Sequence, residues 1–111
     1  MRLVVIESPY AGDIDRNIAY ARAAMRDCLM RGEAPFASHL LYTQPGVLRD
    51  DIQSERTLGM AAGFWWGAKA DATVVYTDLG ITNGMEDGIR SATLENRPIE
   101  RRSIPDWEKS E

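Results

Sequence analysis

The chain has 111 residues, of which 44% are apolar and 27% charged, and its net charge is −4. This length and balance predict one compact globular domain and leave no room for a second. An acidic chain is a poor candidate for binding a nucleic-acid polymer, although a local group of amides and arginines can still hold a small anion.

The predicted elements alternate between strands and helices. Residues 2–8 form a short β-branched run, which is typical of a buried parallel strand. Residues 15–31 carry an apolar stripe at helical spacing, and Gly32 follows at the position of a C-terminal cap. A weaker second strand is predicted at residues 34–41, and a second helix at about residues 51–68.

The second half of the chain continues this alternation. A third strand is predicted at residues 71–78, and it leads into a third helix for which Asn83 is a natural N-cap. A last strand at residues 97–104 carries enough charge to predict an edge position. The order predicts an α/β fold, a parallel sheet of about four strands with three main helices on its two faces. Residues 1–103 are expected to form the domain and residues 104–111 a mobile tail.

Two features bear on where the protein resides. Residues 3–6 are the only consecutive apolar residues at the N-terminus, too few for a signal peptide or a membrane span. Cys28, the single cysteine, falls at an apolar helical position and predicts a buried thiol in a reducing compartment. A cytoplasmic protein is therefore expected.

In a parallel sheet of this kind a ligand crevice lies at the carboxyl ends of the strands, where the strand order changes direction. Three segments are expected to meet there: residues 8–13, 39–45 and 77–85. The first, SPYAGD, can face an anion with its backbone amides, and Tyr10 can stack on a base; a plain turn is the alternative. A dinucleotide fingerprint GxGxxG is absent.

Several polar residues and glycines are candidates for this crevice. His39, the only histidine, can act as a general base or phosphate donor, or close the sheet end structurally, and it has no sequence neighbour that would suggest a metal site. Asp78 can bind a ribose hydroxyl or cap a turn. Gly84 and Gly88 share one helical face, which allows either a ligand or the sheet to approach. The predicted ligand-binding residues are Ser8, Pro9, Tyr10, Gly12, His39, Asp78, Asn83, Gly84, Met85 and Gly88.

The second helix carries glycines at every fourth position, Gly59, Gly63 and Gly67, next to Trp66. Three glycines weaken an isolated helix, and the close approach of another segment compensates for this. A homodimer interface built on these four residues is the favoured interpretation, and close packing within one subunit is the alternative. A membrane helix is excluded, because charged residues flank too short an apolar run.

The segments SPYAGD, DATVVYTDLG and NGMEDGIRSATLENRPI together resemble the nucleoside 2-deoxyribosyltransferase-like superfamily. More closely, the chain resembles a small domain of unknown function found in phages and prophages. The resemblance spans residues 1–102. It implies a flavodoxin-like or Rossmann-like three-layer sheet, oligomers with sites near subunit contacts, and nucleoside or nucleotide ligands, with Tyr10 in the substrate loop.

The resemblance also bears on catalysis. Transferases of this superfamily use a glutamate nucleophile four residues after a glycine of the third helix. That glycine falls on Gly84 and the nucleophile position on Gly88, which has no side chain, while a supporting aspartate falls on Thr82. Glu86 lies about 200° around the helix axis from Gly88, on the other face.

The function implied is a phage-encoded nucleotide- or nucleoside-binding protein of the host cytoplasm, without a catalytic residue or cofactor, that sequesters or senses a nucleotide signal. The alternative is an enzyme that cleaves an N-glycosidic bond, a nucleoside deoxyribosyltransferase or nucleotide hydrolase, with Glu86, Asp78 or Glu7 as its carboxylate. Whether the protein is an enzyme stays open at this point.

Overall fold

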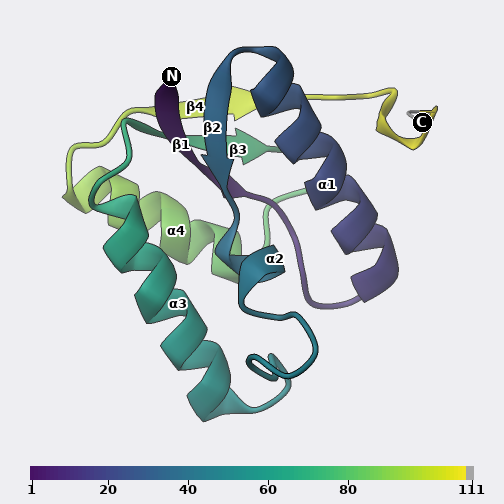
Figure 1. The fold of residues 1–111 in the computed structure, drawn as a ribbon, viewed down its shortest axis with the longest axis vertical. Helices are drawn as coiled ribbons and strands as arrows, with labels where there is room; N and C mark the ends of the chain where they lie inside the picture. The colour runs from purple at the N-terminus through teal and green to yellow at the C-terminus, as the bar shows by residue number, and fades with distance from the viewer. Residues whose placement is uncertain (110–111) are drawn as a thin grey trace.

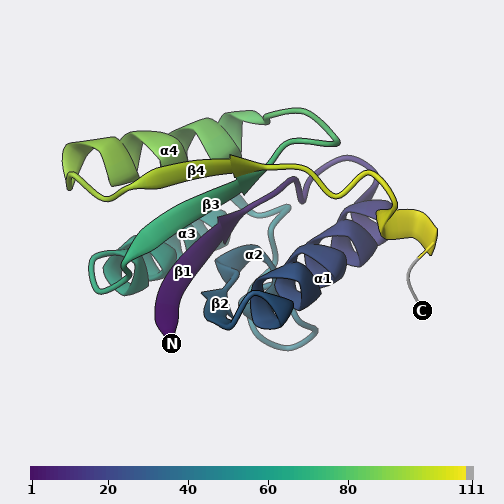
Figure 2. The ribbon, with the colours of Figure 1, turned by 90° about the horizontal axis from the view of Figure 1, so that it is seen from above.

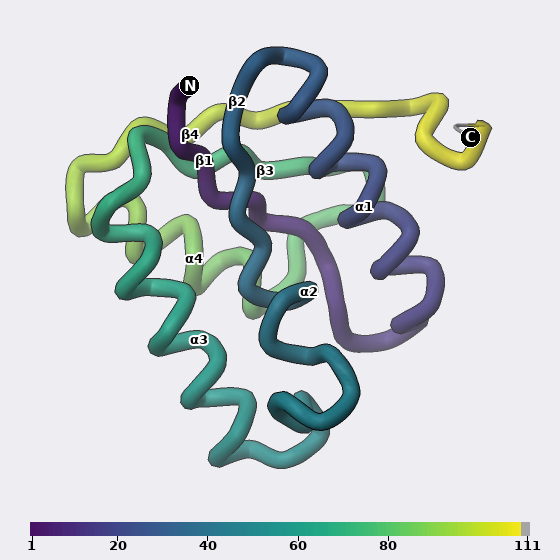
Figure 3. Tube along the Cα trace, viewed as in Figure 1, coloured from purple at the N-terminus to yellow at the C-terminus, as the bar shows by residue number. Residues whose placement is uncertain are grey.

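A computed structural model describes residues 1–109 of the chain. Four parallel strands form one sheet in the order β2-β1-β3-β4 (Figures 1 and 3). The strands are β1 (Arg2–Glu7), β2 (Glu33–Phe36), β3 (Ala72–Tyr76) and β4 (Ile99–Arg102). The predicted α/β fold with a parallel sheet of four strands is confirmed.

Helices cover both faces of the sheet (Figure 2). Helix α1 packs on one face, and α3 and α4 lie together on the other. The helices are α1 (Ile14–Met30), α2 (Ser38–Leu41), α3 (Gln53–Gly67), α4 (Asn83–Leu94) and the single 3₁₀ turn η1 (Trp107–Lys109). Among residues 1–109 no helix combines the length and the apolar character needed to cross a bilayer.

The core lies between the sheet and α1. Every residue of β3 is buried, as expected for a central strand with helices on both faces. Tyr20 and Cys28 of α1 are fully buried against Tyr76 of β3, and the Cys28 sulfur lies 3.3 Å from the Tyr76 hydroxyl. The prediction of a buried thiol at Cys28 is confirmed.

Two predicted boundaries are wrong. The second strand stops at Phe36 instead of residue 41, and residues 38–41 form the short helix α2, whose first turn is closed by the Ala37 carbonyl. His39 therefore lies on a helix and not at a strand end. The N-cap of α4 is Thr82 and not Asn83, because the Thr82 hydroxyl accepts a hydrogen bond of 3.2 Å from the Met85 amide.

The glycines of α3 pack within their own subunit. A Cβ atom at Gly63 would lie 2.8 Å from the Ser38 hydroxyl oxygen of α2, and one at Gly67 would lie 3.1 Å from an Arg97 nitrogen. At Gly59 the nearest atom is the Leu48 Cδ1, at 3.3 Å. These contacts favour the alternative of close packing within one subunit, and the dimer interface stays a prediction.

Trp66 differs from the three glycines because 57% of its surface is exposed. Its ring packs on Phe36 with centroids 5.4 Å apart, and its indole nitrogen donates to the Tyr42 hydroxyl at 2.9 Å. Trp66 is thus the most exposed member of the predicted interface, while Gly59 is half-buried and Gly63 and Gly67 are buried.

The described part of the predicted mobile tail is docked. Ile104 and Trp107 pack against the core, and the Trp107 ring meets Tyr20 edge-on at a centroid distance of 5.2 Å. The Arg16 guanidinium lies 5.8 Å from the centre of the same indole. Residues 110–111 of the predicted tail lie outside the described residues.

Candidate functional site

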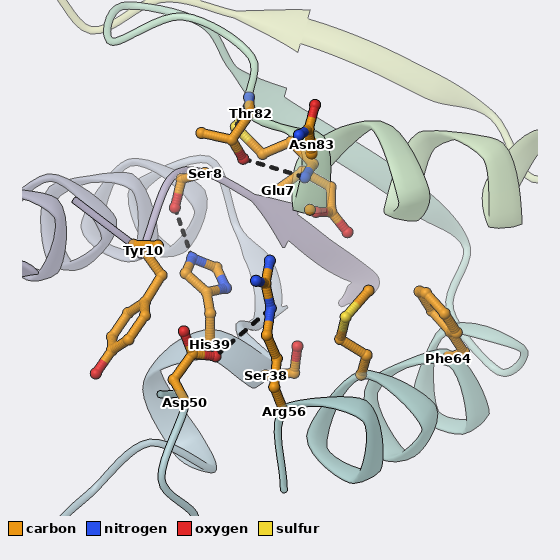
Figure 4. Close-up of a pocket in the computed structure, with 14 residues that line it drawn as sticks. Glu7, Ser8, Tyr10, Ser38, His39, Asp50, Arg56, Phe64, Thr82 and Asn83 are labelled. Carbon is orange, nitrogen blue, oxygen red and sulfur yellow. Dashed lines mark hydrogen bonds and ion pairs between the residues drawn. The ribbon is translucent and has the colours of Figure 1, made fainter. Parts of the chain in front are cut away.

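A cleft of about 300 Å³ opens at the carboxyl ends of β1 and β3 (Figure 4). These neighbouring strands continue into helices on opposite faces of the sheet, so the cleft lies at the switch point expected from the predicted fold. Its volume is at the lower end of the range for small-molecule sites. Its walls come from the loop after β1, from α2, from α3 and from the first turn of α4.

The structure brings six of the predicted ligand-binding residues to this cleft: Ser8, Tyr10, His39, Asn83, Gly84 and Met85. Four others, Pro9, Gly12, Asp78 and Gly88, are not among the residues that line it. Glu86, one of the carboxylates considered for catalysis, is exposed on α4 and is also outside the cleft.

Asp78 has a structural role. Its carboxylate accepts hydrogen bonds from the Tyr20 hydroxyl at 2.7 Å, the Ser103 hydroxyl at 2.6 Å and the Ile104 amide at 2.8 Å. Burial by itself would raise the pKa of Asp78, but these hydrogen bonds outweigh it and the pKa is lowered. Asp78 thus joins the segment after β4 to α1, and three of the roughly four acceptor sites of its carboxylate are used within the protein.

Ser8 and His39 form a polar pair on one wall of the cleft, with 2.6 Å between the Ser8 hydroxyl oxygen and Nε2 of His39 (Figure 4). Burial lowers the pKa of His39 to about 4, because the imidazolium is poorly solvated there. At neutral pH the ring is therefore neutral. His39 can exchange hydrogen bonds with a ligand through Ser8, but it does not supply a positive charge to a phosphate.

Glu7, the last residue of β1, occupies the space beside Gly88. A Cβ atom on Gly88 would lie 2.0 Å from a Glu7 carboxylate oxygen and 2.3 Å from the Glu7 Cδ. Real Cβ atoms do not approach other atoms this closely, so residue 88 must be glycine while Glu7 keeps this position. Gly88 thus makes room for a carboxyl group from the neighbouring strand, a use that was not foreseen from the sequence.

The surroundings of Glu7 disfavour its charge. Burial raises the pKa of the Glu7 carboxyl to about 8, while Arg97 acts to lower it and Asp87 acts to raise it. The carboxyl faces the cleft beside the first turn of α4 (Figure 4). Among residues 1–109 no hydrogen bond joins it to another group, and its oxygens are open to the cleft, since no fully buried side-chain oxygen there lacks a partner. At pH 7 most molecules carry a neutral carboxylic acid here.

Arg56 of α3 faces the first turn of α4 across the cleft. One guanidinium nitrogen lies 3.5 Å from the position of a Cβ atom on Gly84, and Nε is 4.0 Å from Asp50. At the start of α4 the Thr82 side chain and carbonyl satisfy the amides of residues 85 and 86, but not those of Asn83 and Gly84. The positive end of the helix and a guanidinium therefore converge on one point, which suits an anion.

Arg56 was missed from the sequence. It is one of 13 basic residues, and nothing in its spacing marks it as facing a helix that begins much later in the chain. Glu7 carried a weak signal, because it ends a buried strand directly before the SPY turn. The contact that explains its importance, with Gly88, depends on how α4 packs against β1.

Over residues 2–102 the chain matches a family described as a domain of unknown function, DUF7768. The chain belongs to the DUF7768 family. No curated protein matches this DUF7768 chain.

Among solved structures, the DUF7768 chain is similar to the 2-deoxyribosyltransferase of the psychrotolerant bacterium Bacillus psychrosaccharolyticus. The TM-score is 0.64 at 15% sequence identity, and the match covers 96% of this chain and 88% of the other. That enzyme is described as a biocatalyst for the synthesis of antiviral and antitumoral nucleosides. At this level of identity the likeness shows a shared fold, and the fold implied by the sequence resemblance is thereby confirmed.

Proposed function

We propose that this DUF7768 domain binds a nucleoside or nucleotide in the cleft at the ends of β1 and β3. The observation that carries the proposal is the convergence of Arg56 with the Asn83 and Gly84 amides of α4, for which residues 1–109 provide no hydrogen-bond partner. These groups suit a phosphate, and the fold is shared with an enzyme used to synthesise nucleosides. The phosphate lies at the first turn of α4, Tyr10 stacks on the base, and the Ser8–His39 pair binds the ribose.

A panel of nucleosides and their 5′-phosphates tests the proposal by thermal unfolding. A ligand at 100 times its dissociation constant adds about 2.7 kcal/mol to the free energy of unfolding. We expect nucleotides to stabilise the protein more than the matching nucleosides. Failure of every compound to stabilise it at about 1 mM would contradict binding in the useful range.

Replacement of Arg56 by methionine is expected to weaken nucleotide binding at least tenfold and nucleoside binding little, because a charged hydrogen bond to phosphate contributes about 1.5–3 kcal/mol. Titration calorimetry of the two ligands measures the difference. Arg22→Met, which removes an exposed arginine from α1, is the matched control. Equal losses for nucleoside and nucleotide would place the phosphate elsewhere.

A second candidate function is cleavage of an N-glycosidic bond, favoured by the carboxyl group of Glu7 beside Gly88. In this reaction the ionised carboxylate attacks C1′ of the sugar, and the bond from C1′ to the base nitrogen breaks. The base leaves with the bonding electrons and takes a proton from solvent, and water then releases the sugar from Glu7. Of the three carboxylates considered from the sequence, Glu7 is the one that lines the cleft.

Chromatography for free base after incubation with deoxynucleosides or their monophosphates tests this candidate. Because the pKa of Glu7 is about 8, the rate is expected to rise with pH up to that value as the nucleophilic form accumulates. Glu7→Gln should abolish release, and Glu86→Gln, which changes an exposed carboxylate of α4, should not. Absence of any free base from the unaltered protein would remove the candidate.

The biological setting is proposed on the resemblance alone. A phage-encoded protein that sequesters or senses a nucleotide signal in the host cytoplasm is consistent with nucleotide binding without catalysis. A homodimer is retained as a proposal with the exposed Trp66 as its contact, since the glycines of α3 are covered within the subunit. Sedimentation as a monomer at micromolar concentrations would argue against it.

A further inference from the structure

We infer that Glu7 is a specificity-determining residue of the cleft, which forms hydrogen bonds with one uncharged polar group of the ligand, either a sugar hydroxyl or the edge of a nucleobase. The inference rests on the proposed binding function. Glu7 is the residue that recognises the part of the ligand away from the phosphate. Neither the family description nor the likeness to the deoxyribosyltransferase assigns a role to this residue.

The first argument is that the Glu7 carboxyl has no partner among the described residues. Other carboxylates inside the protein are satisfied: Glu33 by Arg102, and Asp78 by three donors. The Glu7 oxygens are therefore open to the cleft, because among residues 1–109 every fully buried side-chain oxygen has a hydrogen-bond partner. A ligand in the cleft supplies the partner that the protein itself does not.

The second argument is the glycine that accommodates it. Glycine within a helix destabilises it by about 1 kcal/mol relative to alanine. Gly88 lies inside α4 and is buried, and any side chain there would collide with the Glu7 carboxyl. The helix thus carries a destabilising residue at the one place that lets this carboxyl reach the cleft.

The third argument concerns charge. Arg97 is the cation that acts to lower the pKa of Glu7, but its guanidinium is already bonded to the Gly67 carbonyl, the Thr73 hydroxyl and Glu95. Asp87 of α4 opposes ionisation of Glu7.

Across the cleft, His39 of α2 is neutral at pH 7, and Arg56 of α3 lies beside Asp50. A neutral carboxylic acid both donates and accepts hydrogen bonds, and this matches a hydroxyl or an amide-like base edge. The anionic group of the ligand binds instead at Arg56 and the start of α4.

The test is ligand affinity as a function of pH, measured by calorimetry between about pH 7 and pH 9.5, where a nucleotide phosphate no longer changes charge. Suitable probes are adenosine, cytidine and their 5′-monophosphates, because these bases do not titrate in this range. For the unaltered protein we expect affinity to fall roughly tenfold between about pH 7 and pH 9, since the pKa of Glu7 is about 8.

The variant Glu7→Gln keeps one donor and one acceptor without an ionisable proton. It is expected to bind at neutral pH within a few-fold of the unaltered protein and to lose the pH dependence. Glu7→Ala is expected to bind about tenfold more weakly at neutral pH. Glu86→Gln, on the exposed face of α4, should retain the original profile. Ribose 5-phosphate and free adenine as separate probes show whether the sugar or the base produces the pH step.

Binding that falls with pH equally in the unaltered protein and in Glu7→Gln would overturn the inference and leave the proposed function standing. Absence of binding by every probe to every variant would overturn both. A rise in affinity through pH 8 would also overturn it, because the ionised form would then be the one that binds.

A measurement without ligand checks that the fold survives the replacement. The pKa of Glu7 is raised in the folded protein from 4.5 to about 8, so the group's contribution to stability is present below 4.5 and is lost as pH rises to about 8. Glu7→Gln should remove this loss from the curve of unfolding free energy against pH. An unchanged curve would overturn the inference, because Glu7 would then not be neutral in the folded protein.

Discussion

Arg102→Met is expected to lower the free energy of unfolding by about 3–5 kcal/mol, the usual effect of leaving a buried ion without its partner. Two guanidinium nitrogens of Arg102 donate to the two carboxylate oxygens of Glu33, at 2.8 and 2.7 Å. The two side chains are only 5% and 9% exposed. Arg102 also donates to the Tyr76 hydroxyl at 3.2 Å, so its removal takes a hydrogen-bond donor from both Glu33 and Tyr76.

Urea unfolding of the two proteins at neutral pH measures this difference. Arg2→Met is the matched control, because Arg2 also pairs with Glu33 but its side chain is 40% exposed. The control is expected to lose less than about 1 kcal/mol. Equal losses in both variants would mean that burial of the Arg102–Glu33 pair does not decide its contribution.

The same pair predicts how stability depends on pH. Hydrogen bonds from Arg102, ahead of those from Arg2, lower the pKa of Glu33 from 4.5 to about 2. The stabilisation is therefore present above the unfolded value of 4.5 and is lost as pH falls towards 2. In Arg102→Met this part of the acid transition should become shallower.

Gly88→Ala is expected to weaken ligand binding about tenfold at neutral pH, as Glu7→Ala does, and to lower the free energy of unfolding by at most about 1–3 kcal/mol, since the overlapping atoms are the far end of a flexible side chain. The new Cβ would overlap a Glu7 oxygen at 2.0 Å, so the Glu7 side chain must leave its position in the cleft. The gain of about 1 kcal/mol from alanine in a helix offsets part of this loss. Calorimetry and urea unfolding measure the two effects separately.

The double variant Glu7→Ala/Gly88→Ala separates the clash from the role of the carboxyl group. It removes the overlapping atoms, so the unfolding free energy should recover while ligand binding should not. Gly84→Ala is the matched control for stability, because its Cβ would lie 3.5 Å from Arg56, an ordinary contact. If Gly88→Ala alone keeps full stability and binding, the Glu7 side chain moves freely and does not depend on Gly88.

The sequence alone predicted the order of the four strands and the three long helices, and the region of the cleft, but not the short helix α2. Three local patterns predicted which segments are buried and which are exposed: the β-branched run of β1, the apolar stripe of α1 with Cys28, and the charges of β4. That information is local, because it lies in the spacing of neighbouring residues. A parallel sheet with short crossovers then brings the ends of β1 and β3 together, so the position of the cleft followed without any knowledge of side-chain contacts.

Only the tertiary structure showed which groups contact the glycines of α3 and α4. The glycines of α3 and Gly88 of α4 each indicated close approach, but the spacing could not say whether a second subunit, a ligand or a side chain of the same chain would fill the space. Packing placed Ser38 against Gly63, and Glu7 against Gly88. It also brought Arg56 to the start of α4. These contacts join residues far apart in the chain. Their geometry depends on how the helices pack on the sheet, and the spacing of residues in the sequence does not contain that information.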